Sequence, residues 1–276
     1  MESKVRDNRR RPERMPVLFI GHGSPMNVVL KNSFTNRLAE LGRQLPRPRT
    51  ILVISAHWLT EGTCVTCMDK PKTVYDFYGF PDALYRIRYP SSGSPDDARL
   101  VKESVRSAHI ECNYDWGLDH ASWTILKHMY PSADIPVIEM SLDYSPYNEW
   151  QPKLTKHYYD LAAELAPLRD RGILIIGSGN IVHNLRLIDF KDMDATPYDW
   201  ALEFDEKVKR NLISRNHEEL LNCRDMDKAA SLSVPTLDHY LPMVCALGLQ
   251  EEDEPLNFIY EGFQHGSVSM RAFQIG

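Results

Sequence analysis

The 276-residue sequence lacks the features that mark several large classes of protein. No apolar run approaches the roughly 20 residues that a membrane-spanning helix needs, so we expect no membrane partner. The net charge of −6 and the isoelectric point of about 5.9 argue against nucleic acid as a partner. There is also no internal repeat, no low-complexity linker and no break in composition. A single globular domain is therefore the simplest organisation.

The first 14 residues lack the apolar core of a secretory signal. They carry six basic and three acidic side chains. We interpret residues 1–14 as a disordered basic tail and residues 15–276 as the domain. A weak contact of the tail with nucleic acid or another anion is the alternative. Without a secretory signal, the expected location is the cytoplasm.

Cysteine is scarce and odd in number: Cys64, Cys67, Cys112, Cys223 and Cys245. Scattered cysteines without a signal predict a reducing compartment. Cys64 and Cys67 form one Cys-x-x-Cys pair, but a structural zinc site needs a second pair of ligands, and the neighbouring sequence offers none. On a strand, residues three apart face opposite sides. We therefore interpret this pair as ordinary packing and not as a redox or metal centre.

Short apolar runs rich in β-branched residues are typical of strands buried on both faces, as in parallel sheets. Such runs alternate with amphipathic segments that have helical periodicity. We predict strands at residues 17–20, 51–57, 63–68, 135–142, 173–176, 256–260 and 268–275, and helices at 33–44, 94–107, 121–129, 149–169, 200–213 and 236–248. This order predicts a single-domain α/β fold with a central, mostly parallel or mixed sheet flanked by helices.

Histidines follow three of these strands. His22 lies between two glycines after the first strand, His57 ends the second, and His183 comes just after residues 173–176. The carboxyl ends of parallel neighbours meet at one edge of a sheet, which is where ligands bind. Imidazoles are common ligands of transition metals. The sequence therefore predicts a metal site at this edge.

Two further histidines lie at helix starts. Pro242 lacks an amide hydrogen and belongs in the first turn of its helix, which puts His239 at the helix mouth. His120 follows Asp119 at the start of another helix. The remaining histidines have polar or helical contexts and are interpreted as surface or satisfied residues: His109, His128, His157, His217 and His265.

Residues 73–90 show neither helical nor strand periodicity and are rich in tyrosine and phenylalanine. An aromatic loop can form the wall of a pocket for a flat substrate. It can equally be packed by its own side chains. Both interpretations stay open, and Arg86 and Arg88 are candidates to receive a carboxylate.

Five short strings, in this order, resemble the class III extradiol ring-cleaving dioxygenases and, more closely, their DOPA-dioxygenase branch: Gly21–His22–Gly23–Ser24–Pro25–Met26, Ser55–Ala56–His57–Trp58, Gly117–Leu118–Asp119–His120, Gly179–Asn180–Ile181–Val182–His183–Asn184 and His239–Tyr240–Leu241–Pro242. The resemblance implies a single α/β domain with a non-haem metal held by His22, His57 and His239. It also implies that His183 is an acid–base catalyst or a further ligand, and that His120 contacts the substrate or shuttles a proton.

The expected reaction is the 4,5-cleavage of a catechol such as L-DOPA by dioxygen to a semialdehyde. Iron(II) is the expected cofactor, although three neutral imidazoles also suit zinc, which has no redox chemistry. Histidine exchanges protons near neutral pH, so we assign acid–base catalysis to His183, with His120 as the second candidate. Proximity in the sequence suggests Ser24, Asn27 and Tyr240 as substrate-binding residues.

Two alternatives use the same scaffold. A zinc hydrolase would use the three imidazoles with Asp119 or Asp238 as the base. A non-enzymatic metal- or ligand-binding protein is the other, because a fold does not decide a function. The expected partners are a small catechol and dioxygen, and the chain is expected to be a monomer or a small homo-oligomer.

Overall fold

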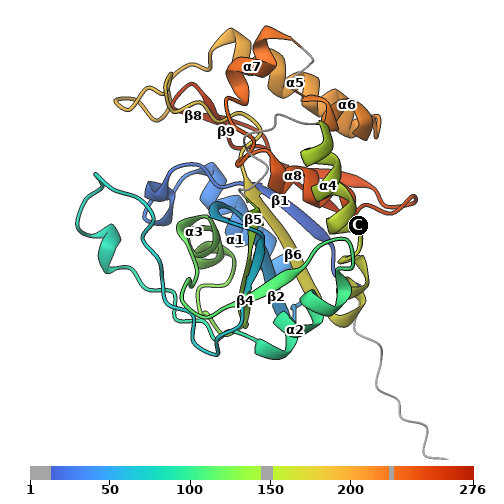
Figure 1. The fold of residues 1–276 in the computed structure, drawn as a ribbon. Coiled ribbons are helices and arrows are strands. Elements are labelled where there is room, and N and C mark those ends of the chain that lie inside the picture. Colours follow the sequence, from blue (N-terminus) through green and yellow to red (C-terminus); the bar gives the residue numbers. More distant parts are fainter. Residues whose placement is uncertain (1–13, 144–151, 224–226) are drawn as a thin grey trace, which may run out of the picture.

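The computed structural model describes residues 14–143, 152–223 and 227–276, so nearly all of the predicted tail lies outside it (Figure 1). Its centre is an eight-stranded sheet with the strand order β4-β3-β5-β2-β6-β1-β10-β7. These strands are β1 (Val17–Gly21), β2 (Thr50–Thr60), β3 (Thr63–Thr66), β4 (Ile110–Asn113), β5 (Val137–Asp143), β6 (Ile173–Gly179), β7 (Leu256–Tyr260) and β10 (Ala272–Ile275). A separate small sheet pairs β8 (Phe263–Gln264) with β9 (Val268–Ser269).

The sheet is mixed, with a parallel centre. β5, β2, β6 and β1 run parallel to one another, and β3 pairs in parallel with β4. β10 and β7 add antiparallel strands at one side, and β3 is antiparallel to β5. Because β2, β6 and β1 are parallel neighbours, their carboxyl ends share one edge, as predicted.

Helices cover both faces of the sheet (Figure 1). α1 (Ser33–Gln44) and α3 (His120–Met129) pack on one face, whereas α2 (Pro95–Ser104), α4 (Pro152–Ala163) and α8 (Leu241–Gly248) pack on the other. α5 (Asp199–Ile213) packs against α6 (His217–Leu221) and α7 (Lys228–Ser233) and also contacts β9 (Figure 1). The predicted α/β class is thus confirmed. Among the described residues, none of the helices has both the length and the apolar character that crossing a membrane requires.

Several element boundaries differ from those predicted. The expected helix over residues 149–169 starts outside the described residues, and α4 ends at Ala163. A 3-10 helix, Ala166–Arg171, follows because Pro167 can occupy a first turn but cannot continue the helix before it. Gly172, with φ 78°, is the predicted stop. The expected strand over residues 268–275 is divided into β9 and β10, and β4, α6 and α7 were not predicted.

The interpretation of the Cys-x-x-Cys pair as ordinary packing is wrong for Cys67. Cys67 forms a disulfide with Cys112, and Cys64 is free. The parallel pairing of β3 with β4 brings these two residues together across a sequence separation of 45. A pairing at that distance along the chain has no local signal, which is why the sequence did not indicate it.

Candidate metal centre

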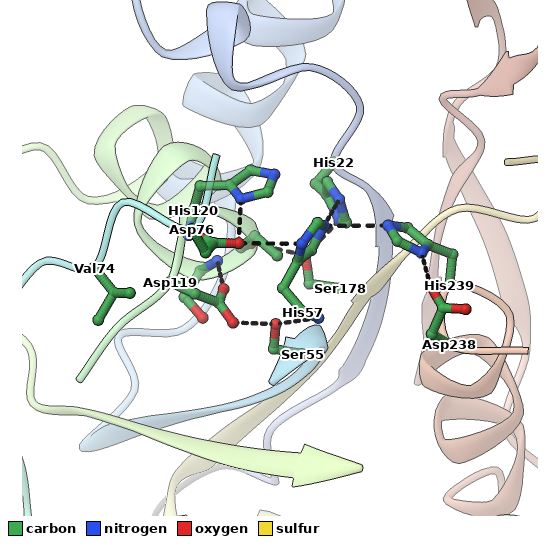
Figure 2. Close-up of polar contacts among 12 residues, drawn as sticks. His22, Ser55, His57, Val74, Asp76, Asp119, His120, Ser178, Asp238 and His239 are labelled. Carbon is green, nitrogen blue, oxygen red and sulfur yellow. Dashed lines mark hydrogen bonds and ion pairs between the residues drawn. The ribbon is translucent and has the colours of Figure 1, made fainter. Parts of the chain in front are cut away.

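Three elements carry the converging histidines. His22 directly follows β1, and His57 lies in β2 where the pairing with β5 shifts register between Ile54 and Leu59. Such an irregularity redirects side chains at the end of a strand. His239 lies just before α8, whose first turn contains Pro242 as predicted. All three side chains reach the shared edge of β2, β6 and β1 (Figure 2).

Two glycines of β6 allow α8 to approach this closely. A Cβ at Gly179 would lie 2.2 Å from the backbone oxygen of His239, and one at Gly177 would lie 2.2 Å from that of Pro242. The amide of Asn180 also donates to the His239 carbonyl at 2.9 Å. Glycine at the end of β6 is therefore what lets His239 reach the site.

The imidazoles face one another through their Nε2 atoms. His57 Nε2 lies 3.2 Å from His22 Nε2 and 3.1 Å from His239 Nε2 (Figure 2). A tetrahedral ion with metal–nitrogen bonds of about 2.0–2.1 Å needs ligand nitrogens about 3.3 Å apart, so these separations fit a bound metal.

By distance alone, two groups of side chains could hold a metal: His22 with His57 and His120, and His183 with Asp238 and His239. In each group the ligand atoms lie within 4.8 Å of one another.

Each of the three facing imidazoles has a partner at Nδ1. Asp76 binds His57 Nδ1 at 3.1 Å, and Asp238 binds His239 Nδ1. His22 Nδ1 lies 3.2 Å from Ser178 Oγ, which itself donates to the Ala121 carbonyl at 2.7 Å.

Because the hydroxyl hydrogen of Ser178 is used in this way, Ser178 Oγ accepts from His22 Nδ1–H. A carboxylate likewise only accepts hydrogen bonds. A neutral ring with its hydrogen on Nδ1 leaves Nε2 free to bind a metal.

The surroundings favour neutral rings at three positions. Burial, reinforced by neighbouring histidines, lowers the pKa of His22 and His183 well below its ordinary value. Burial also lowers the pKa of His239, although Asp238 opposes the shift. At His57 burial acts in the same direction, but the hydrogen bond to Asp76 and the negative charges of Asp76, Asp119 and Asp238 together outweigh it, so the pKa is raised. Neutral imidazole is the form that coordinates a metal.

His120 and His183 border this group. The ring of His120 lies 4.1 Å from that of His57, and its Nδ1 lies 2.7 Å from Asp76 Oδ2. Burial and the nearby His57 lower the pKa of His120 to about 4, against the opposing effect of Asp76. The His183 ring stacks on His239 with centroids 3.5 Å apart. The structure thus brings together all five histidines that the sequence singled out.

The three suggested substrate-binding residues have other contacts. Ser24 Oγ caps the 3-10 helix Pro25–Val28 by accepting from the Met26 amide at 3.2 Å. Asn27 is buried and donates to the His22 carbonyl at 3.2 Å and to Gln264 Oε1 at 3.0 Å, so it holds the loop after β1.

Tyr240 does not reach the site. Its buried hydroxyl donates to the Leu220 carbonyl at 3.1 Å, and its ring packs near Phe204. The turn before α8 directs neighbouring side chains to different sides, and the ring of Tyr240 packs into the hydrophobic core while the His239 ring enters the site. The suggestion that Tyr240 contacts the substrate is therefore corrected.

A buried pair of acids lies behind the site. Asp119 Oδ2 accepts from Ser55 Oγ at 2.6 Å, and Ser55 Oγ accepts from the His57 amide at 3.1 Å. Glu139 on β5 accepts from Trp116 Nε1 at 2.8 Å and from the Asp119 amide at 3.1 Å. Burial raises the pKa of Asp119 well above its ordinary value and that of Glu139 to about 7. Glu139 was not predicted, because a single acid in an apolar strand carries no motif.

The aromatic loop fits both interpretations of residues 73–90. Tyr75 and Phe77 contact each other and Trp123, so the loop is packed by its own side chains. Phe77 also lies edge-on to His120 with ring centroids 5.7 Å apart, so it borders the histidine group. Arg88 is used within the loop, where it lies over the Tyr75 ring at 5.2 Å.

Comparisons with known proteins agree with this architecture. Residues 17–273 match the family described as the catalytic LigB subunit of aromatic ring-opening dioxygenase. The chain is 44% identical to 4,5-DOPA dioxygenase extradiol of Escherichia coli (strain K12) over 280 residues, covering 100% of both proteins. It is 33% identical to 4,5-DOPA dioxygenase extradiol of Mirabilis jalapa, over 91% of this chain and 92% of that protein. A crystal structure of an uncharacterized protein from Escherichia coli K12 superposes with a TM-score of 0.81 at 41% identity, covering 95% of this chain and 100% of that one.

Proposed function

Because this chain belongs to the extradiol ring-opening dioxygenase family of the catalytic LigB subunit, we propose that it opens the ring of a catechol such as L-DOPA. The proposed reaction is 4,5-cleavage by dioxygen to a semialdehyde. The observation that carries the proposal is the convergence of three Nε2 atoms, 3.1 and 3.2 Å apart, whose rings are each engaged at Nδ1. Relatives named 4,5-DOPA dioxygenase extradiol support the choice of substrate.

We infer that His22, His57 and His239 are the metal ligands. His57 Nε2 lies 3.2 Å from His22 Nε2 and 3.1 Å from His239 Nε2, and these are the separations that a shared metal ion requires. Iron(II) is the proposed physiological metal, because it supplies the redox chemistry that reaction with dioxygen requires and that zinc lacks. Zinc would bind the same three nitrogens without supporting turnover.

The flanking histidines have distinct proposed roles. His183 has a lowered pKa and is therefore neutral at pH 7, so a ring nitrogen can take a proton from a catechol hydroxyl and return it to a departing oxygen. His120 is held at Nδ1 by Asp76, which leaves Nε2 to contact a substrate oxygen. Phe77 beside His120 offers an apolar wall for the ring and excludes water.

The hydrolase alternative is less well supported, because its candidate bases are occupied. Asp119 is fully buried against Ser55 and Glu139. Asp238 is paired with His239 Nδ1. Neither carboxylate is available to activate a water molecule.

The test is dioxygen uptake by protein stripped of metal and reloaded anaerobically with iron(II) or with zinc. Given a panel of catechols that includes L-DOPA, the iron-loaded protein is expected to consume dioxygen and to form a yellow semialdehyde, whereas the zinc-loaded protein is expected to be inactive. Absence of uptake with every catechol at full iron occupancy would refute the proposal.

Two variants assign the roles within the same assay. His183→Ala is expected to retain iron and to lose turnover by about 10²–10⁴-fold, which is typical of a lost acid–base group. His57→Ala is expected to lose the metal while remaining folded. Full turnover by iron-loaded His183→Ala would remove His183 from the chemistry.

A further inference from the structure

The carboxylate of Asp76 faces three N–H groups at the edge of the site and can accept a hydrogen bond from each. Its Oδ1 accepts from the backbone amide of His120 at 2.9 Å. Its Oδ2 lies 2.7 Å from His120 Nδ1 and 3.1 Å from His57 Nδ1 (Figure 2). The side chain is only 10% exposed, so water does not compete freely for these contacts.

The geometry points to Asp76 as a positioning residue that fixes two imidazoles of different function, the metal ligand His57 and the substrate-facing His120, in one tautomer and one orientation. This inference rests on the proposed function for the roles of the two histidines. It assigns to the aromatic loop a part in assembling the metal site, because Asp76 belongs to that loop.

An ionised carboxylate only accepts, so both Nδ1 atoms that face Asp76 carry hydrogen. A neutral ring with its hydrogen on Nδ1 has a bare Nε2. At His57 that nitrogen faces His22 and His239, and at His120 it remains for a substrate oxygen.

Asp238 provides the comparison within the same molecule. It also binds the Nδ1 of a ligand histidine, His239, and within the described part of the chain it makes no hydrogen bond to His120. Outer partners of this kind orient the ring of a ligand and strengthen its basicity. Asp76 does this for one ligand and holds the neighbouring His120 as well, so its removal is expected to change His120 in addition to the metal affinity, whereas removal of Asp238 should leave His120 unchanged.

The same contact positions the substrate wall. Asp76 lies between Tyr75 and Phe77, and Phe77 is edge-on to His120 at 5.7 Å. Val74, two residues before Asp76, is held in place by two hydrogen bonds: its amide donates to the Leu118 carbonyl at 2.7 Å, and its carbonyl accepts from Trp123 Nε1 at 2.9 Å. With the loop anchored at Val74 in this way, the Asp76 carboxylate links the aromatic side chain of Phe77 to the position of His57 and His120.

The test uses zinc as the probe and the variant Asp76→Asn. An asparagine oxygen can keep the bond from the His120 amide, which preserves the start of α3, but its NH₂ group then faces two N–H groups. We expect the affinity for zinc to fall by about 10–100-fold. In long-range ¹H–¹⁵N NMR spectra of the zinc-loaded protein, the wild type is expected to show His120 with hydrogen on Nδ1, and Asp76→Asn to show a shift toward hydrogen on Nε2.

Asp238→Asn is the matched control, since it should weaken zinc binding to a similar degree and leave the His120 spectrum unchanged. The same His120 spectrum in both variants, or zinc affinity of Asp76→Asn within twofold of wild type, would overturn the inference. Hydrogen on Nε2 of His120 in the wild type would overturn it without any variant. None of these measurements uses dioxygen, so failure of ring cleavage would refute the proposed function separately.

Discussion

Glu139 is a fully buried acid on β5, directly paired with Val53 of β2. Burial raises its pKa to about 7, against hydrogen bonds from Asp119, Ser122 and Trp116 that oppose the shift. In the unfolded chain the ordinary value of 4.5 applies. Between these two values the folded protein keeps a proton that the unfolded chain has lost.

The free energy of unfolding should therefore fall as the pH rises from about 4.5 to about 7, by up to about 3 kcal/mol. Glu139→Gln cannot titrate and should remove most of this dependence. Urea unfolding of metal-free protein at pH 5 and pH 8 measures the difference. The exposed Glu111→Gln is the control and should behave as wild type. An unchanged pH dependence in Glu139→Gln would contradict the raised pKa.

One disulfide joins two segments at the β4 side of the sheet. The Cys67–Cys112 disulfide connects the segment after β3 to β4, a strand of only four residues. So short an edge strand makes few contacts of its own. The link should therefore contribute stability mainly by restricting the unfolded chain.

Cys112→Ser should lower the free energy of unfolding by up to about 4 kcal/mol, the value expected for closing a loop of this length. Cys64→Ser, which removes a free cysteine on the neighbouring strand β3, should have a much smaller effect. Denaturant unfolding with and without a reducing agent is the measurement. Reduction should bring wild type to the level of Cys112→Ser and leave that variant unchanged, and a wild type insensitive to reduction would argue against the disulfide.

On the scale of the whole molecule, the metal centre joins distant parts of the chain. Its proposed ligands follow β1, lie in β2 and precede α8, so a bound ion would tie the N-terminal strand to the C-terminal third of the protein. Binding to the folded state alone stabilises it by mass action, by about 4 kcal/mol when the free metal is a thousandfold above its dissociation constant.

Zinc should accordingly raise the unfolding midpoint, and a chelator should lower it. Thermal unfolding in zinc and in chelator gives the comparison. His57→Ala should show nearly the same midpoint in both conditions. A wild-type midpoint that does not respond to zinc would mean that the converging histidines do not hold a metal.

Features of local origin could be predicted from the sequence. The apolar strands, the helix starts and the histidines after them follow from composition and from covalent constraints. Pro242 shows this best, because the missing amide hydrogen alone places it in the first turn of α8 and His239 at the helix mouth. Parallel neighbours then bring strand ends to a common edge, so His22, His57 and His183 could be grouped in advance, and the family resemblance added His120 and His239.

Only the tertiary structure decided which groups stand behind those histidines. Asp76 comes from a loop without periodicity, Ser178 from an apolar strand, and Cys67 pairs across 45 residues. Tyr240 shows the same limit, because its direction depends on packing in the core and not on its neighbour His239. Local sequence determines which elements form and where they end. The partners of a side chain in the folded protein depend on long-range packing, which short-range patterns do not encode.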